Sequence, residues 1–117
     1  MASDLEARVE RLRMRNRLVL SSLASAGDDG STPRLVTHSV MPAASGTVAG
    51  DSDLRAALAP YGFAIGFNAA GDGYRLDHET AVATEDFDRL TVELLRLLAP
   101  LGWNYDGWEC AVVKPGA

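Results

Sequence analysis

Apolar residues recur every three or four positions near the start of the chain, which predicts an amphipathic helix over residues 1–26. Ser3 and Glu6 have the spacing of a capping box, and Gly27 is a natural end for this helix. A polar residue, Asn16, interrupts the stripe, so it either specifies register in a helix pair or lies at the edge of the buried face. The apolar stripe consists of Leu5, Val9, Leu12, Val19 and Leu23.

Alternation with a period of two predicts four strands, at 34–41, 63–68, 74–83 and 108–114. Two helices separate them: one is capped by Asp51 or Ser52 and runs to about Ala59, and the other follows an N-cap at Thr84.

This order of elements over residues 33–114 predicts an α+β domain with a ferredoxin-like βαββαβ antiparallel sheet, strand order 4-1-3-2, and two helices on one face. Three positions are open for the additional N-terminal helix: the open sheet face, the sheet edge or a partner chain.

A chain of 117 residues is expected to form one domain, residues 1–117. There is no apolar run of about 18 residues, and charged residues interrupt the N-terminus, so neither a membrane span nor a signal peptide is expected. The single cysteine, Cys110, has no internal disulfide partner, which favours a reducing cytoplasm.

The net charge of −5 disfavours direct, general binding of nucleic acid, which depends on Lys and Arg meeting phosphates. The rest of the chain is more acidic still, because five of the 11 basic residues lie in the first helix. Such a surface suits a basic protein partner, although acidic surfaces also serve solubility alone. The clustered residues are Arg8, Arg11, Arg13, Arg15 and Arg17.

Candidate catalytic chemistry is limited to His38 and His78, which lie on neighbouring strands of the expected sheet. Such a pair could act as general base and general acid in phosphodiester cleavage. Both positions, however, lie on strand faces rich in apolar residues, which favours hydrogen-bonded, half-buried histidines. No spacing of His, Cys, Asp and Glu typical of a zinc or calcium site occurs, and no phosphate-binding loop, so neither a metal nor a cofactor is expected.

The end of the chain is rich in aromatic residues, with Trp103, Tyr105 and Trp108 close together. Asp106-Gly107 between them predicts a tight turn, because Asp bonds backbone N–H groups and Gly adopts positive φ. Trp108 then anchors the last strand, and Tyr105, Asp106 and Glu109 are expected on an exposed rim. Anchoring and partner binding are compatible functions of this segment.

The stretch "YDGWE" at 105–109, after a leucine-rich helix and "APLGWN", resembles the C-terminal signature of the regulator of ribonuclease activity B family, the ribonuclease E inhibitor domain. Upstream, "GDDGSTPRLVTHSV" at 27–40 is similar to the family's helix end, turn and arginine-led strand with a histidine. "YGF" at 61–63 also fits, so the resemblance spans nearly the whole chain in the right order.

The resemblance implies a ferredoxin-like fold and a cytoplasmic bacterial protein without catalytic activity. It implies that the protein binds ribonuclease E and modulates RNA turnover by protein–protein contact. The arginine-rich first helix is unlike that expected of an acidic relative. A partner other than ribonuclease E is therefore an open alternative. The candidate partner-binding residues are Asp28, Asp29, Arg34, His38, Tyr105, Asp106, Trp108 and Glu109.

Two other functions remain alternatives. The first is an enzyme that cleaves phosphodiesters with His38 and His78, which requires both imidazoles to share a cleft. The second is a structural homo-oligomer that associates through the open sheet face or the N-terminal apolar stripe.

Overall fold

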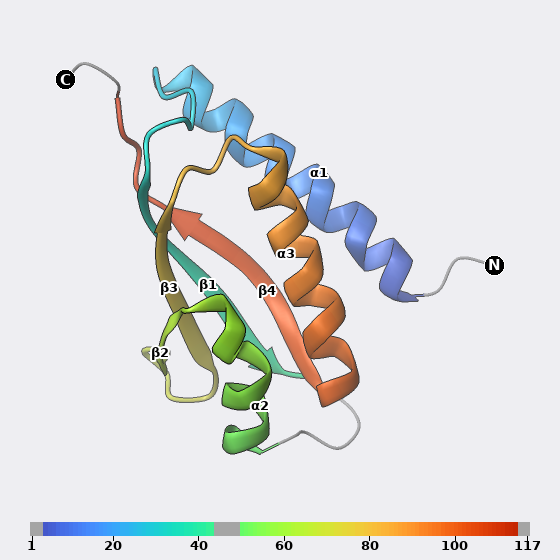
Figure 1. Ribbon diagram of the computed structural model, residues 1–117. Helices are drawn as coiled ribbons and strands as arrows, with labels where there is room; N and C mark the ends of the chain where they lie inside the picture. The colour runs from blue at the N-terminus through green and yellow to red at the C-terminus, as the bar shows by residue number, and fades with distance from the viewer. Residues whose placement is uncertain (1–3, 44–49, 115–117) are drawn as a thin grey trace.

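The computed structural model describes residues 4–43 and 50–114 as three helices and a four-stranded sheet (Figure 1). The helices are α1 (Asp4–Ser25), α2 (Asp51–Leu58) and α3 (Glu85–Leu98). The strands are β1 (Arg34–Pro42), β2 (Ala64–Phe67), β3 (Tyr74–Thr80) and β4 (Trp103–Cys110). Short 3-10 turns, Ala59–Tyr61 and Ala99–Leu101, follow α2 and α3.

All neighbouring strands pair antiparallel, in the order β2-β3-β1-β4. The α+β class and the predicted strand order are therefore confirmed. Helices α2 and α3 lie on the same face of the sheet (Figure 1). Their apolar stripes meet the inward side chains of the strands, and Val40, Leu76, Leu94 and Leu98 have no exposed surface.

Helix α1 lies beside α3 and against the edge strand β4, where it widens the helical layer (Figure 1). Its buried stripe of Val9, Leu12, Asn16 and Leu23 matches the predicted periodicity. Of the three positions considered for this helix, the observed one is nearest to the sheet edge. The opposite face of the sheet is left without a covering helix among the described residues.

The beginnings of the helices differ in how they are capped. Thr84 caps α3 as predicted, because its side-chain oxygen accepts a hydrogen bond from the backbone N–H of Phe87 at 3.0 Å. The predicted side-chain cap of α2 is wrong: Gly50 is the N-cap, and Asp51 lies within the first turn. Ser3, the expected cap of α1, lies outside the described residues.

The predicted turn at Asp106-Gly107 is also wrong, because β4 runs through this dipeptide without reversing. His38 pairs with Trp108 and Val40 pairs with Tyr105, so two residues of β4 oppose one residue of β1 in a β-bulge. Gly107 makes the bulge possible with a φ of 98°.

The bulge changes which side chains of β4 face the helices. In a regular strand, side chains three positions apart point to opposite faces. Here Tyr105 and Trp108 both pack on the helical side, Tyr105 in the main core and Trp108 against a smaller cluster around Phe87. The bulge therefore places the two aromatic side chains of the "YDGWE" motif in one interior.

Candidate functional site

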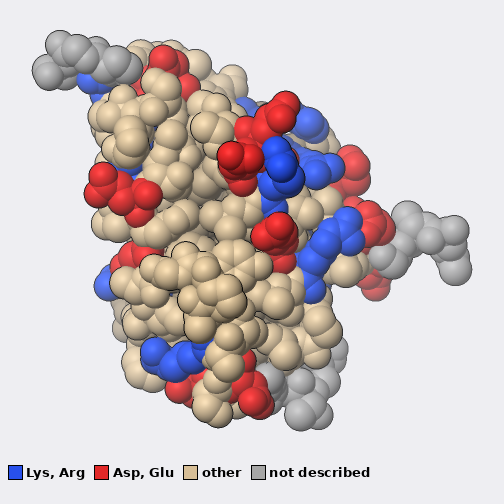
Figure 2. Space-filling model, viewed as in Figure 1, with Lys and Arg blue, Asp and Glu red and all other residues tan. Residues whose placement is uncertain are grey.

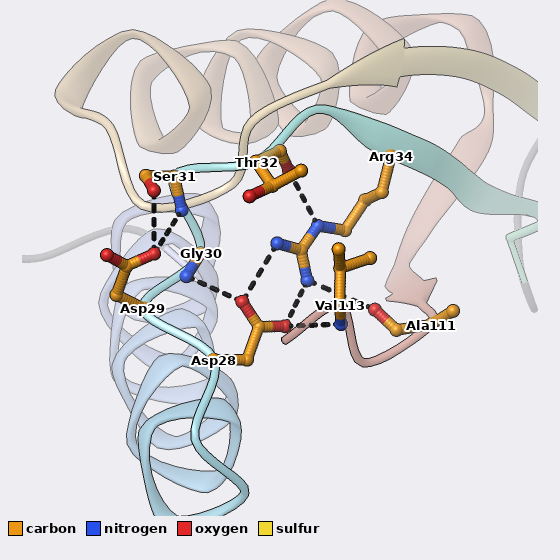
Figure 3. A network of polar contacts seen from close by, with 8 residues as sticks. All are labelled: Asp28, Asp29, Gly30, Ser31, Thr32, Arg34, Ala111 and Val113. Carbon is orange, nitrogen blue, oxygen red and sulfur yellow. Dashed lines mark hydrogen bonds and ion pairs between the residues drawn. The ribbon is translucent and has the colours of Figure 1, made fainter. Parts of the chain in front are cut away.

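A buried ion pair, Asp28–Arg34, closes the junction between α1 and β1 (Figure 3). The side chain of Asp28 has 0% exposure and that of Arg34 has 2%. The Arg34 guanidinium donates to both carboxylate oxygens of Asp28, with a distance of 2.9 Å from Nη2 to Oδ1. The pair therefore belongs to the interior and is not a surface contact.

Backbone groups complete this junction (Figure 3). The Asp28 carboxylate also accepts from the N–H groups of Gly30, at 2.9 Å, and Val113, at 2.8 Å. Arg34 donates to the carbonyl oxygens of Thr32, at 3.0 Å, and Ala111, at 3.1 Å. The hydrogen bond from Arg34 is the main reason that the pKa of Asp28 lies well below its ordinary value.

Asp29, the next residue, is exposed and faces away from this junction. Its carboxylate accepts from the N–H of Ser31 at 3.0 Å and from the Ser31 hydroxyl at 2.6 Å. These hydrogen bonds lower the pKa of Asp29, so it is a charged, oriented group at the surface.

A second polar group forms a chain through the core from Tyr105 to His38 to His78. The Tyr105 hydroxyl lies 2.6 Å from Nδ1 of His38, and Nε2 of His38 lies 2.8 Å from Nε2 of His78. A neutral imidazole has one donor and one acceptor nitrogen. Each hydrogen bond of this chain therefore has one donor and one acceptor when both histidines are neutral and every proton points in the same direction along the chain.

Burial favours the neutral forms of all three groups. Desolvation, together with the charge of His78, lowers the pKa of His38 to about 3. Desolvation also lowers the pKa of His78 and raises that of Tyr105.

This arrangement partly fits the expectation for a catalytic pair. The imidazoles do converge on one face of the sheet, as the strand positions allowed. His38, however, has 0% exposure and is surrounded by the rings of Phe63, Phe87 and Tyr105. The three cavities described beside α1 are not lined by either histidine. His38 has no surface through which it could contact a substrate.

Asn16 is the third buried polar centre, and it joins α1 to both α3 and β4. Its amide nitrogen donates to Asp88 Oδ1 at 2.9 Å and to Thr91 Oγ1 at 3.0 Å, and its oxygen accepts from Trp108 Nε1 at 2.7 Å. Of the two explanations for a polar residue in the helical stripe, the structure supports a position inside a helix pair.

The face of the sheet opposite the helices carries several acidic side chains. Thr37 lies at its centre, paired with Asp77 on one side and Glu109 on the other. Glu79 is paired with Leu35, which is 61% exposed. We call the group of Leu35, Thr37, Asp77, Glu79 and Glu109 the outer acidic face. Among the described residues, Asp77 is paired with Arg75 at 3.4 Å, whereas Glu79 and Glu109 form no ion pair.

Sequence reasoning missed Leu35, Asp77 and Glu79 as members of this surface. Alternation along β3 puts Asp77 and Glu79 on the face of the sheet that His78 does not share, so the sequence did contain a signal that the two acidic side chains lie together. What the sequence lacked was the position of α1, which decides which face of the sheet stays uncovered.

The eight candidate residues thus divide by burial. Asp28, Arg34, His38 and Tyr105 are buried, and the expectation of Tyr105 on an exposed rim is wrong. Trp108 is half-buried. Its ring lies edge-on to that of Phe87, with 4.8 Å between the ring centroids. The exposed candidates are Asp29, Asp106 and Glu109.

The described residues offer neither a metal site nor a membrane-spanning helix. No group of three or more His, Cys, Asp or Glu side chains in that part of the chain is arranged to hold a metal ion. None of the described helices has the length and apolar character needed to span a bilayer.

Comparison with known proteins gives one finding. No curated protein matches the chain. The family model described as "Regulator of ribonuclease activity B" matches residues 13–110. This range covers most of α1, the whole sheet and all eight candidate residues. The chain therefore belongs to the regulator of ribonuclease activity B family.

Proposed function

We propose that this protein binds ribonuclease E, or a related component of RNA decay, through the outer acidic face and modulates its activity without cleaving RNA itself. Family membership supports regulation of a ribonuclease. The observation that carries the choice of surface is the uncovered sheet face with its acidic side chains. The same proposal includes a ferredoxin-like fold and a cytoplasmic location for the protein.

The outer acidic face has the chemistry of a docking surface for a basic segment. Glu79 and Glu109 lie on the two strands that flank β1, and neither is neutralised by an ion pair within the described residues. Exposed Leu35 offers apolar contact between them. Complementary charge across an interface accelerates association and selects the partner.

Charges on the helical side are arranged differently. There, acidic and basic side chains lie next to one another (Figure 2). Arg13 pairs with Asp88 at 3.3 Å, and Arg96 pairs with Glu6 at 2.8 Å. Because Asp88 and Glu6 are each held by an arginine, and further arginines of α1 lie beside them, the helical side offers a weaker negative field to a basic partner.

The two alternative functions have less support. Catalysis by the histidine pair requires access to substrate, and His38 has none. Self-association through the N-terminal stripe requires a free stripe, but Val9, Leu12 and Leu23 are buried within the chain. Self-association through the outer acidic face would bring like charges together.

The test is an assay of ribonuclease E activity on a labelled RNA, with and without the purified protein. The double variant Glu79→Gln/Glu109→Gln should require about tenfold more protein for the same effect, because two charges at the interface are lost. The control Glu10→Gln/Asp53→Asn removes two exposed charges from helices and should behave like the wild type.

Two results would contradict the proposal. Equal potency of the outer-face variant and the control would remove this surface from the interaction. Cleavage of RNA by the protein alone, abolished in His38→Gln, would show that it is an enzyme.

A further inference from the structure

A cavity of ≈ 140 Å³ lies between α1 and β4, and three of its eight lining residues are arginines. Arg8, Arg11 and Arg15 all contribute to it, at positions i, i+3 and i+7 on one side of α1. Helical periodicity therefore brings three guanidinium groups to a single opening.

The charges of these arginines are not neutralised within the described residues. Arg8 donates to the side-chain oxygen of Asn104, a neutral group. No carboxylate in that part of the chain forms an ion pair with Arg8, Arg11 or Arg15. Most other arginines differ in this respect, since Arg13 and Arg96 each hold an acidic partner.

The rest of the cavity suits a short side chain with an anionic end. Leu12 and Leu95, both buried, provide an apolar floor. The bulge at Gly107 leaves room for Arg15, whose Nη2 would lie 3.4 Å from a Cβ at that glycine. Arginine holds carboxylates with two parallel N–H···O bonds, so the opening matches a carboxylate whose methylene groups rest on the floor.

We infer that this cavity binds an Asp or Glu side chain of a partner protein. The inference rests on the proposed function in taking the ligand to be part of a protein. A long polyanion such as RNA fits less well, because the protein carries a net charge of −5 and Asp106 lies in the same lining. A single acidic side chain meets the arginines without placing further negative charge along the outer acidic face.

The cavity lies partly outside the segment that matches the family model, although Arg15, Asn104 and Asp106 lie within that segment. Arg8 and Arg11 precede residues 13–110, the range that matches the family model. The protein thus presents two surfaces of opposite charge on the two sides of β4: the outer acidic face for a basic segment, and the arginine-lined cavity for an acidic one.

The experiment measures fluorescence polarisation of a labelled Gly-rich peptide that carries a single Glu, in about 0.15 M salt to limit non-specific attraction. The wild type should bind it at least about tenfold more tightly than the same peptide with Gln in place of Glu. Arg11→Gln/Arg15→Gln should lose this preference. Asp106→Asn should strengthen binding, because a repelling carboxylate is removed.

The matched control is Arg13→Gln/Arg17→Gln, which removes the same charge from the same helix but not from this cavity. It should weaken binding by less than about threefold. Far-UV circular dichroism of each variant checks that the helices are intact.

Three outcomes would overturn the inference: no binding of the acidic peptide, equal losses in the two double variants, or tighter binding of a single-stranded RNA of the same length that depends on Arg11 and Arg15. The ribonuclease assay separates the two proposals. If Glu79→Gln/Glu109→Gln still impairs regulation while the peptide fails to bind, only the cavity inference is wrong.

Discussion

The Nε2 atoms of His38 and His78 lie 2.8 Å apart, although the residues come from different strands and His38 has no exposed surface. A proton can be shared at this distance only while at least one ring is neutral. Charging both would place two cations against each other among aromatic rings. The histidine pair is therefore a structural element whose stability depends on pH.

We predict that the protein loses stability as the pH falls below about 6.5, the ordinary pKa of histidine. The unfolded chain takes up a proton there, whereas His38 in the folded state does so only near its lowered pKa of about 3. The stability that neutral, buried His38 contributes is fully present above pH 6.5 and is lost as the pH falls towards 3. The free energy of unfolding falls by up to about 1.4 kcal/mol per pH unit in this range.

Urea unfolding at pH 7, 6, 5 and 4 measures this loss. His38→Gln should reduce the slope over that range. The Asp28 carboxylate acts in the same direction, but mainly below its unfolded pKa of about 3.9, so the two losses of stability overlap only below about pH 4. A wild-type stability that stays constant from pH 7 to 4.5 would contradict the prediction.

Adjacent residues of the α1–β1 junction should respond very differently to the same substitution. Asp28→Asn removes the charge that faces Arg34 in the interior and leaves that guanidinium buried without a counter-ion. Asp29→Asn changes an exposed carboxylate whose partner is Ser31. We expect a much larger fall in Tm for Asp28→Asn, by thermal unfolding monitored with circular dichroism. Similar shifts in Tm for the two variants would mean that the buried ion pair contributes little to stability.

The bulge of β4 should be sensitive to a side chain at Gly107. Gly107→Ala places an L-residue at a φ of 98° and should destabilise the fold by about 1–2 kcal/mol. The control is Gly66→Ala in β2, where no atom lies within 4 Å of the new Cβ and φ is not positive. Chemical unfolding of both variants gives the comparison, and equal stabilities would show that the bulge tolerates a side chain.

The attachment of α1 should depend on Asn16. Asn16→Ala leaves Trp108 Nε1 and Thr91 Oγ1 without the amide that they contact, at a cost of about 1–3 kcal/mol. Hydrogen exchange should then accelerate in α1 more than in α3. Met14→Ala, at a position 54% exposed on the same helix, is the control and should leave the exchange rates nearly unchanged. If exchange accelerates equally in both helices, Asn16 stabilises the whole fold and not the attachment of α1.

Periodicity in the sequence was enough to predict the helical stripes and the strand order. Spacing of apolar residues along α1 and α3 depends only on local geometry, and pairing in a small antiparallel sheet follows from the order of the elements. Thr84 was equally predictable, because an N-cap is satisfied within one turn of its own helix.

Features that depend on distant contacts could not be predicted. Asp106-Gly107 has the composition of a turn and of a bulge, and only the pairing of Tyr105 and Trp108 with β1 decides between them. Arg34 belongs to a residue type that is usually exposed. Its burial depends on Asp28 and on the chain after β4, which closes over the ion pair through Val113.

The bulge in β4 also has a consequence for how the length of this strand can change. It inserts one extra residue between Tyr105 and Trp108. Both of these side chains therefore point inward although they are three positions apart in the sequence. A shortened chain lacking Gly107 would keep Trp108 inside and Glu109 outside. A strand of unchanged length without the bulge would turn the indole into solvent and Glu109 into the core. At this point of the strand, losing a residue is the conservative change.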